Sequence, residues 1–312
     1  MTRADYTIPV LLAALAILLV LGLLLPKWLF LLTLALGKGL VVLGLMLLLR
    51  TGLVSFGQGL FYCLGAYAVG SLGQFLGIKE VLVLLLTGVA VGSLIAVILG
   101  LLMAKYRGIF FAMLSLAFSM IAYGLLVKTA ALGSTDGFNV APPTLFGRPI
   151  GGEQHQYALF ALACILVSVA AVLTHEYLRT PLGRLAPAIR DNEIRVEYMG
   201  ASVRNAIHVK YVIAGALAGL GGALVAMTVG HIDPEMAYWT TSGEFIFVAI
   251  LSGTGSVIAP FLGSFVFEII RTYAYQYSPN TWQLVLGSAL LLVIVFLPAG
   301  LWSAFSYIRR RT

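Results

Sequence analysis

Charged residues are scarce in this sequence. Asp, Glu, Lys and Arg make up only 10% of its 312 residues, whereas hydrophobic residues make up 61% and the mean hydropathy is +1.02. A soluble chain is normally about a quarter charged, so this chain has too little polar surface to cover a core in water. The composition therefore excludes an ordinary soluble domain.

Cysteine and histidine are also few. Cys63 and Cys164 lie far apart within apolar stretches, which is typical of small buried side chains. The four histidines lack the spacing of metal ligands, and no residues form a catalytic set. A Gly-x-x-x-x-Gly-Lys-Ser/Thr phosphate-binding loop is absent as well. We therefore expect no enzyme activity, no cofactor and no metal site, and no binding of ATP through a phosphate-binding loop.

Long apolar runs are what the sequence has in plenty. Residues 9–25, 81–103 and 284–297 contain no charge. A helix needs about 20 apolar residues to cross a bilayer, and lipid offers the backbone no hydrogen-bond partners. We expect an all-α integral membrane protein, a helical bundle in one domain over residues 1–312, with eight to ten spans. The ten candidate spans are 8–25, 29–49, 53–76, 81–103, 108–130, 156–178, 208–229, 240–252, 257–276 and 282–303.

The positions of Lys and Arg predict the orientation. If the N-terminus is cytoplasmic and the spans alternate, thirteen of these residues fall inside and five fall outside or at outer helix ends. Cytoplasmic loops of membrane proteins carry an excess of Lys and Arg. Both termini are therefore expected in the cytoplasm, and the net charge of +7 needs no nucleic-acid partner.

Two loops are longer than simple connections require. The outer loop, 131–157, is rich in Gly and Pro, and the inner loop, 179–207, carries eight charged residues. Thr180 and Pro181 are typical of a helix start, and Gly200 is typical of the residue after a helix end. We therefore expect the inner loop to contain a short helix.

This helix is predicted over residues 188–199, with Gly183 interrupting the segment before it. Four apolar residues share one face at helical spacing, and Asp191 and Arg195 stand four apart as an ion pair would. The apolar residues are Leu185, Ile189, Val196 and Met199. Three interpretations stay open from these residues: a helix lying on lipid, a solvated loop helix, or a helix in the groove of a partner.

A family resemblance favours the third interpretation. Residues 183–200 read Gly-Arg-Leu-Ala-Pro-Ala-Ile-Arg-Asp-Asn-Glu-Ile-Arg-Val-Glu-Tyr-Met-Gly. They resemble the cytoplasmic coupling segment, the EAA-type loop, of branched-chain amino acid ABC permeases. Residues 52–67 resemble the family's Gly-Leu-Leu-Ser-Leu-Gly-His and Gly-Ala-Tyr segments, and residues 133–137 resemble its outer Thr-Gly-Gly-x-Asp-Gly. The likeness covers about residues 35–302 and is greater to the M-type permease of the Liv system than to the H-type.

The resemblance implies a type II-like importer permease in a bacterial or archaeal inner membrane. Its partners would be an H-type permease, two cytoplasmic ATPase subunits and an external, periplasmic solute-binding protein. Branched-chain amino acids are the implied substrates, although related systems carry urea, short amides or aromatic acids. The coupling residues implied by the match are Gly183, Arg184, Arg190, Glu193, Glu197 and Gly200.

The sequence departs from the family pattern at three places. Gln58 replaces a common His, Pro187 replaces a basic residue, and Arg195-Val196 replaces Ala-Ala. We expect coupling to survive these changes, but together they leave the identity of the substrate open.

Charged residues within the spans are the remaining candidates. Each costs about 2.5–3.5 kcal/mol at the bilayer centre, so such residues are either functional or paired. Glu268 and Arg271, three apart, are predicted to pair with each other. Lys38 and Glu244 either face a translocation pathway or form pairs, including pairs with a partner subunit. A rival class of protein, an ion-coupled secondary transporter, would use these two residues as its coupling groups.

Polar residues in the spans complete the candidate pathway. Besides Lys38 and Glu244 it contains Gln58, Ser115 and Ser119. The two serines share a helix face, and the alternative for them is a hydrogen bond to a carbonyl of their own helix.

Overall fold

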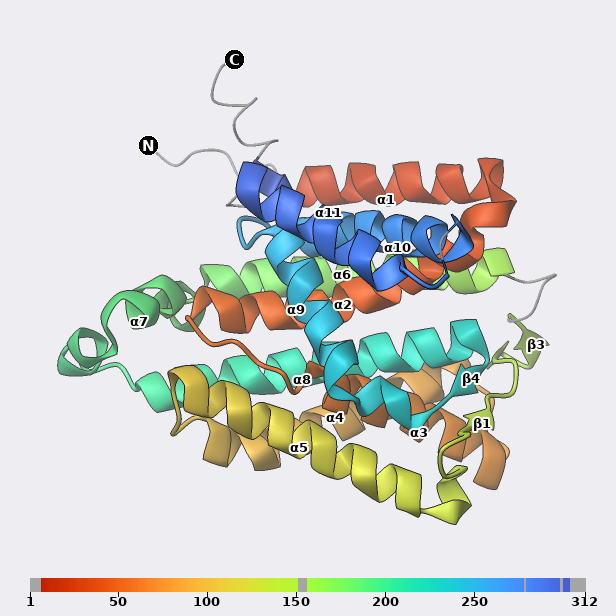
Figure 1. Cartoon of the computed structure of the whole chain (residues 1–312), viewed down its shortest axis with the longest axis horizontal. Helices are drawn as coiled ribbons and strands as arrows, with labels where there is room; N and C mark the ends of the chain where they lie inside the picture. The colour runs from red at the N-terminus through yellow and green to blue at the C-terminus, as the bar shows by residue number, and fades with distance from the viewer. Residues whose placement is uncertain (1–6, 151–155, 278, 298–299, 304–312) are drawn as a thin grey trace.

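The computed structural model describes residues 7–150, 156–277, 279–297 and 300–303. Parts of the predicted outer loop and last span, and the predicted cytoplasmic cations Arg3 and Arg309 to Arg311, lie outside these residues. The described part is a helical bundle with four short strands (Figure 1). The expected all-α membrane fold is therefore confirmed.

Within the described residues, ten helices overlap the ten predicted spans, and α7 (Pro181–Tyr198) lies in the predicted inner loop. Five regions, those of α2, α4, α5, α6 and α8, are long and apolar enough to cross a membrane by length and composition alone. The ten helices are α1 (Thr7–Leu24), α2 (Leu29–Arg50), α3 (Gln58–Phe75), α4 (Val81–Met103), α5 (Gly108–Lys128), α6 (Gln156–Arg179), α8 (Val203–Val229), α9 (Trp239–Ser252), α10 (Ala259–Tyr277) and α11 (Trp282–Phe296). Short 3-10 turns lie at η1 (Pro26–Trp28), η2 (Ala130–Leu132) and η3 (Pro234–Ala237).

Helix α8 is the centre of the bundle, and α2, α3 and α4 pack on it. Small residues allow this packing. A Cβ atom on Gly65 of α3 would overlap the backbone carbonyl of Gly219 in α8, and a Cβ on Gly92 of α4 would meet that of Gly215. Membrane helices approach closely where both surfaces carry small residues. The spacing Gly215-x-x-x-Gly219 therefore has a packing role.

Helix α3 starts later than the sequence predicts. Residues 51–57 are not helical, because Gly52 adopts a left-handed φ of +81° and the Ser55 hydroxyl accepts the hydrogen bond of the Gly57 N–H at 3.2 Å. Figure 1 shows this segment returning from the end of α2 into the bundle before α3 begins. Gln58, the first residue of α3, is fully buried. Such irregular backbone is tolerated at membrane depth when protein surrounds it.

The predicted outer loop contains three short strands, and a fourth follows α8; the sequence did not predict them. Strand β1 (Phe138–Asn139) pairs antiparallel with β4 (His231–Ile232), with Phe138 opposite Ile232. Strand β2 (Thr144–Leu145) forms a hairpin with β3 (Arg148–Pro149). Its two-residue turn, Phe146 and Gly147, has φ values of +51° and +76°, as tight hairpins require. These strands lie at the end of the bundle opposite α7 (Figure 1).

Candidate functional site

Helix α7 begins as the sequence predicts. The Thr180 hydroxyl accepts the hydrogen bond of the Gly183 N–H at 3.2 Å, and Pro181 occupies the first helical position. Gly183, however, does not interrupt the helix. It is buried at the junction with α6, where a Cβ atom would overlap the carbonyl of Tyr177. Gly183 therefore lets α7 turn sharply away from the bundle.

The predicted single helix over 188–199 is wrong, because α7 has a kink at Asn192. This residue is extended, with φ −161° and ψ 99°, and its Oδ1 accepts the hydrogen bond of the Arg195 N–H at 3.0 Å. Asn is a strong N-cap residue, and here it starts a second short helical segment. The kink also breaks the four-residue spacing of Asp191 and Arg195, and no ion pair joins these two described residues.

The end of α7 follows the prediction. Gly200 has a left-handed φ of +86°. Its N–H donates to the Glu197 carbonyl at 2.9 Å, and the Ala201 N–H donates to the Val196 carbonyl at 3.3 Å. These two bonds form a Schellman motif, which fixes the direction of the chain after the helix.

One face of α7 packs on the bundle, and the other carries exposed apolar side chains. Ile189 and Val196 join a buried cluster with residues of α2 and α8, as expected. Met199 is exposed, contrary to the prediction, because the kink turns it outward. With Ile194 and Tyr198 it forms an exposed apolar group, which we call the α7 tip. Ile194 and Tyr198 were not predicted as part of an apolar face, although their four-residue spacing places them on one side of a helix.

The predicted coupling charges of the α7 loop fall into two groups. Glu193 forms an ion pair with Arg107, at the start of α5, with 2.6 Å between Oε2 and Nε. Arg184, Arg190 and Glu197 are exposed. Only Glu193 is therefore bound to the bundle by its charge.

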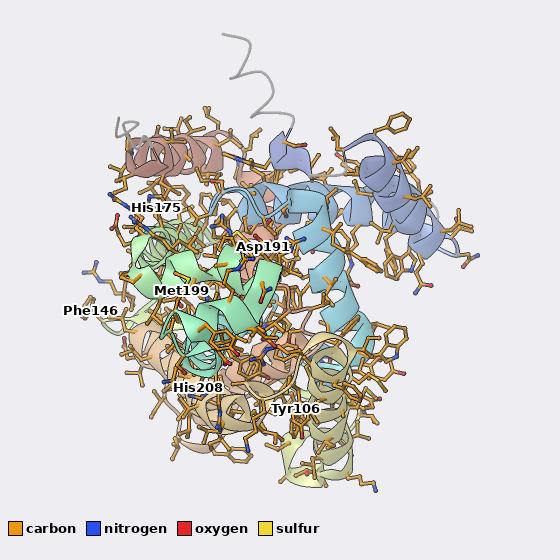
Figure 2. All side chains as sticks on the ribbon, turned by 90° about the vertical axis from the view of Figure 1, so that its left-hand side faces the viewer. Tyr106, Phe146, His175, Asp191, Met199 and His208 are labelled. Carbon is orange, nitrogen blue, oxygen red and sulfur yellow. The ribbon has the colours of Figure 1, made fainter. Side chains whose placement is uncertain are left out.

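The Arg190 side chain of α7 lies close to the ends of α2 and α9. Its side chain lies against Gly52, and both line an open cleft of about 550 Å³ that also includes Thr254. The Arg50 Nε donates to the Thr254 carbonyl at 2.8 Å. The end of α2 is therefore hydrogen-bonded to the segment that follows α9, and Arg190 of α7 lines the cleft beside it. Figure 2 views the protein from this end, with Asp191 and Met199 on the near side.

Four charged side chains form a chain of contacts inside the bundle, in the order Glu268, Lys38, Glu244 and Arg271. The Lys38 Nζ lies 2.6 Å from Glu268 Oε1 and 4.0 Å from Glu244 Oε2. The Arg271 Nη1 lies 2.9 Å from the same Glu244 oxygen. The Arg271 guanidinium also lies 5.6 Å from the ring centre of Trp282. We call these four residues the charge chain.

The predicted pair of Glu268 with Arg271 is therefore wrong. Packing of α10 on α2 brings Lys38 to Glu268, and Arg271 turns toward Glu244 of α9 instead. The Glu268 side chain is only 3% exposed, and a carboxylate so deeply buried needs a cation nearby. Arg271 also lies well inside α10 rather than at its outer end.

The two halves of the charge chain differ in exposure. Lys38, Glu244 and Glu268 all line a closely packed pocket with no room for a water molecule. The side chains of Lys38 and Glu268 are 13% and 3% exposed, whereas those of Glu244 and Arg271 are 25% and 36% exposed. The Lys38–Glu268 half is thus the more buried of the two.

Ser115 and Ser119 connect helices to neighbouring segments. The Ser115 Oγ accepts from the Phe56 N–H at 3.0 Å and donates to the Ala112 carbonyl of its own helix. The Ser119 Oγ donates to the Ala237 carbonyl of η3 at 2.7 Å. Their place in a pathway stays a prediction.

Gln58 is buried beside these serines at the start of α3, which packs on α5. Neither its amide nitrogen nor its amide oxygen has a hydrogen-bond partner within the described residues. Buried amides are normally hydrogen-bonded. Its part in a pathway likewise stays a prediction.

The fold is that of a multi-pass helical membrane protein. The family described as "Branched-chain amino acid transport system / permease component" matches residues 27–295, and the chain belongs to this family. The resemblance noted in the sequence is therefore confirmed.

Three relatives show where the chain stands within the family. It is 29% identical over 289 residues to the high-affinity branched-chain amino acid transport system permease protein LivM of Escherichia coli, covering 85% of this chain and 66% of that protein. It is 25% identical to BraD of Pseudomonas aeruginosa over 264 residues, 80% of this chain and 86% of BraD. LivH of Salmonella typhimurium is 23% identical over 267 residues, 80% of this chain and 85% of LivH.

The predicted likeness to the M-type is confirmed by these relatives. The chain spans slightly less than two thirds of the length of the LivM proteins. No solved structure matches it significantly.

Proposed function

We propose that the chain is a permease subunit of an ATP-driven importer for branched-chain amino acids in a bacterial inner membrane. The observation that carries the proposal is the α7 tip, whose Ile194, Tyr198 and Met199 are exposed outside the bundle. Exposed apolar side chains at helical spacing, surrounded by charges, are typical of a helix that fits the groove of a partner. The α7 end would then face the cytoplasm.

The partner at α7 would be an ATPase subunit. The sequence has no phosphate-binding loop of its own, so hydrolysis would take place on two separate cytoplasmic subunits. A second permease of the H-type and an external solute-binding protein would complete the importer. The printed names of the relatives support the substrate class, because LivM and BraD are named as branched-chain amino acid permeases.

Movement of the ATPases would reach the membrane through α7. Ile189 and Val196 fix it to α2 and α8, and Arg190 lies against the end of α2. Lys38 lies twelve residues from Arg50 in α2, about 18 Å along the helix. A shift of α2 relative to α9 would change the distance between Lys38 and Glu244, now 4.0 Å.

The test replaces the α7 tip. Tyr198→Ser with Met199→Ser should lower ATPase co-purification and substrate uptake by roughly tenfold or more, because anchors of this kind commonly contribute about 2 kcal/mol. Phe146→Ser is the matched control for ATPase co-purification, because Phe146 is 85% exposed, like Tyr198 at 89%, but lies at the opposite end. Unchanged co-purification and uptake in the double variant would contradict the proposal.

The charge chain is the observation that favours the rival, an ion-coupled secondary transporter. Intramembrane carboxylates and lysines are typical of proton and ion relays. Replacing the phosphate-loop lysine of the partner ATPases separates the two classes. Our proposal predicts that uptake stops, whereas uptake that persists and follows an ion gradient would identify a secondary transporter.

A further inference from the structure

The Glu244–Arg271 half of the charge chain has hydrogen-bonding groups that are not used. Both ion pairs of Glu244 use its Oε2, and the ion pair of Arg271 uses its Nη1. Within the part of the chain that the structure describes, Glu244 Oε1 and Arg271 Nε and Nη2 carry no hydrogen bond. One free carboxylate oxygen and one free edge of a guanidinium therefore lie side by side.

This pair is partly exposed on the side of the bundle, away from the ends of α9 and α10. Glu244 is the sixth of fourteen residues in α9, and Arg271 is the thirteenth of nineteen in α10. Exposed charge at this depth is costly against hydrocarbon. This side of the bundle therefore meets either water in a passage or a polar group.

Exposed apolar side chains follow Glu244 along α9. Phe247 lies about 60° and Ile250 about 120° around the helix axis from Glu244, and both are exposed. Helix α9 contacts both α5 and α11, and Figure 2 shows it running between them on one side of the bundle. This side of the bundle thus offers a negative group, a positive group and apolar side chains in close succession.

We propose that Glu244 and Arg271 bind the zwitterionic head group of an α-amino acid in transit. Glu244 Oε1 accepts from the α-ammonium, and Arg271 Nε and Nη2 donate to the α-carboxylate as a two-bond fork. Phe247 and Ile250 contact the apolar side chain. This inference rests on the proposed importer function and names the substrate class that the site selects.

Charge balance supports a zwitterion over the other substrates of the family. Lys38 neutralises Glu268 in the more buried half, so Glu244 and Arg271 are neutral as a unit. A zwitterion adds no net charge to this unit, and its two charged ends match the two free groups. Urea and short amides have neither charge, and a simple carboxylic acid would leave Glu244 without an ammonium partner.

The test measures binding to the assembled transporter without its external protein. The probe is labelled leucine, with two competitors of the same shape: leucinamide, which lacks the carboxylate, and 4-methylpentanoate, which lacks the ammonium. Both competitors should bind at least about tenfold more weakly than leucine, because a site built for a polar group rejects an analogue without it. Arg271→Gln should abolish discrimination against leucinamide, and Glu244→Gln should abolish discrimination against 4-methylpentanoate.

Glu176→Gln is the matched control. Glu176 pairs with Arg179 at 3.1 Å near the α7 end of α6, and both are about half exposed. This variant should keep the discrimination of the unaltered transporter. If the neutral variants fail to assemble, Glu244→Asp and Arg271→Lys retain the charges and should weaken leucine binding while keeping the discrimination.

The outcomes distinguish the two proposals. An unaltered transporter that does not import amino acids would overturn the proposed function. Amino acid import with unchanged discrimination in both neutral variants would overturn only the head-group site. Loss of the second permease from both neutral and charge-retaining variants would also overturn it, because the pair would then belong to a contact between subunits.

Discussion

At the scale of single residues, Glu80 shows how one carboxylate holds the outer hairpin. The N–H groups of Gly147 and Phe146 donate to it at 2.9 and 3.1 Å, and the Thr144 hydroxyl donates at 3.1 Å. The hydrogen bond from Gly147 is the largest cause that lowers the pKa of Glu80 below its ordinary value. The charged form is therefore the one that fits the folded hairpin.

This shift predicts a dependence of the hairpin on pH. Because the pKa of Glu80 is lower in the folded state, its stabilisation is complete above the ordinary glutamate pKa and is lost as the pH falls through the lowered value. Amide hydrogen exchange at Phe146 and Gly147, corrected for intrinsic rates, should lose protection in acid. Glu80→Gln should remove that dependence; an equal acid response in this variant would contradict the assignment.

At the scale of elements, local sequence decides some boundaries and tertiary packing decides others. Helix α4 has the predicted bounds because an uninterrupted apolar run defines it. Helix α3 begins five residues late because Gly52 and Ser55 provide a local alternative to helix. The kink at Asn192 was missed because the apolar spacing continues through it.

The candidate site was predictable as a set of residues but not as pairs. Lys38, Glu244, Glu268 and Arg271 were found because charge is rare in apolar spans. Their pairing depends on which helices pack together, which spacing along one helix does not specify. Likewise, Glu193 was predicted for a partner surface, whereas Arg107, distant in sequence, already binds it. Glu197, in contrast, is exposed and is free to meet a partner.

The packing of α3 on α8 gives a prediction at this scale. Gly65→Ala should lower stability by about 1–3 kcal/mol, since the added methyl meets the backbone of Gly219 rather than a movable side chain. Gly124→Ala in α5 is the matched control, because a Cβ there meets no atom within 4 Å. Thermal unfolding in detergent measures both, and equal midpoints would show that α3 and α8 do not approach as described.

At the scale of the whole molecule, the functional groups are separated along the bundle. Helix α7 lies at one end, the strands lie at the other, and helices α2, α9 and α10, which carry the charge chain, lie between them (Figure 1). The first residues of α1 and the last turn of α11 lie toward the α7 end. Under the proposed function, this order places ATPase contact, substrate contact and external docking in sequence across the membrane.

Direct contact at the α7 tip tests the central claim. A photoreactive side chain introduced as Tyr198→p-benzoylphenylalanine in the complete transporter should crosslink to the ATPase subunit in the membrane. The same substitution at Phe146, equally exposed at the opposite end, should give no ATPase adduct. An ATPase adduct at Tyr198 alone is the result that the account predicts. Crosslinks from Tyr198 to lipid only, or an ATPase adduct at Phe146, would contradict it.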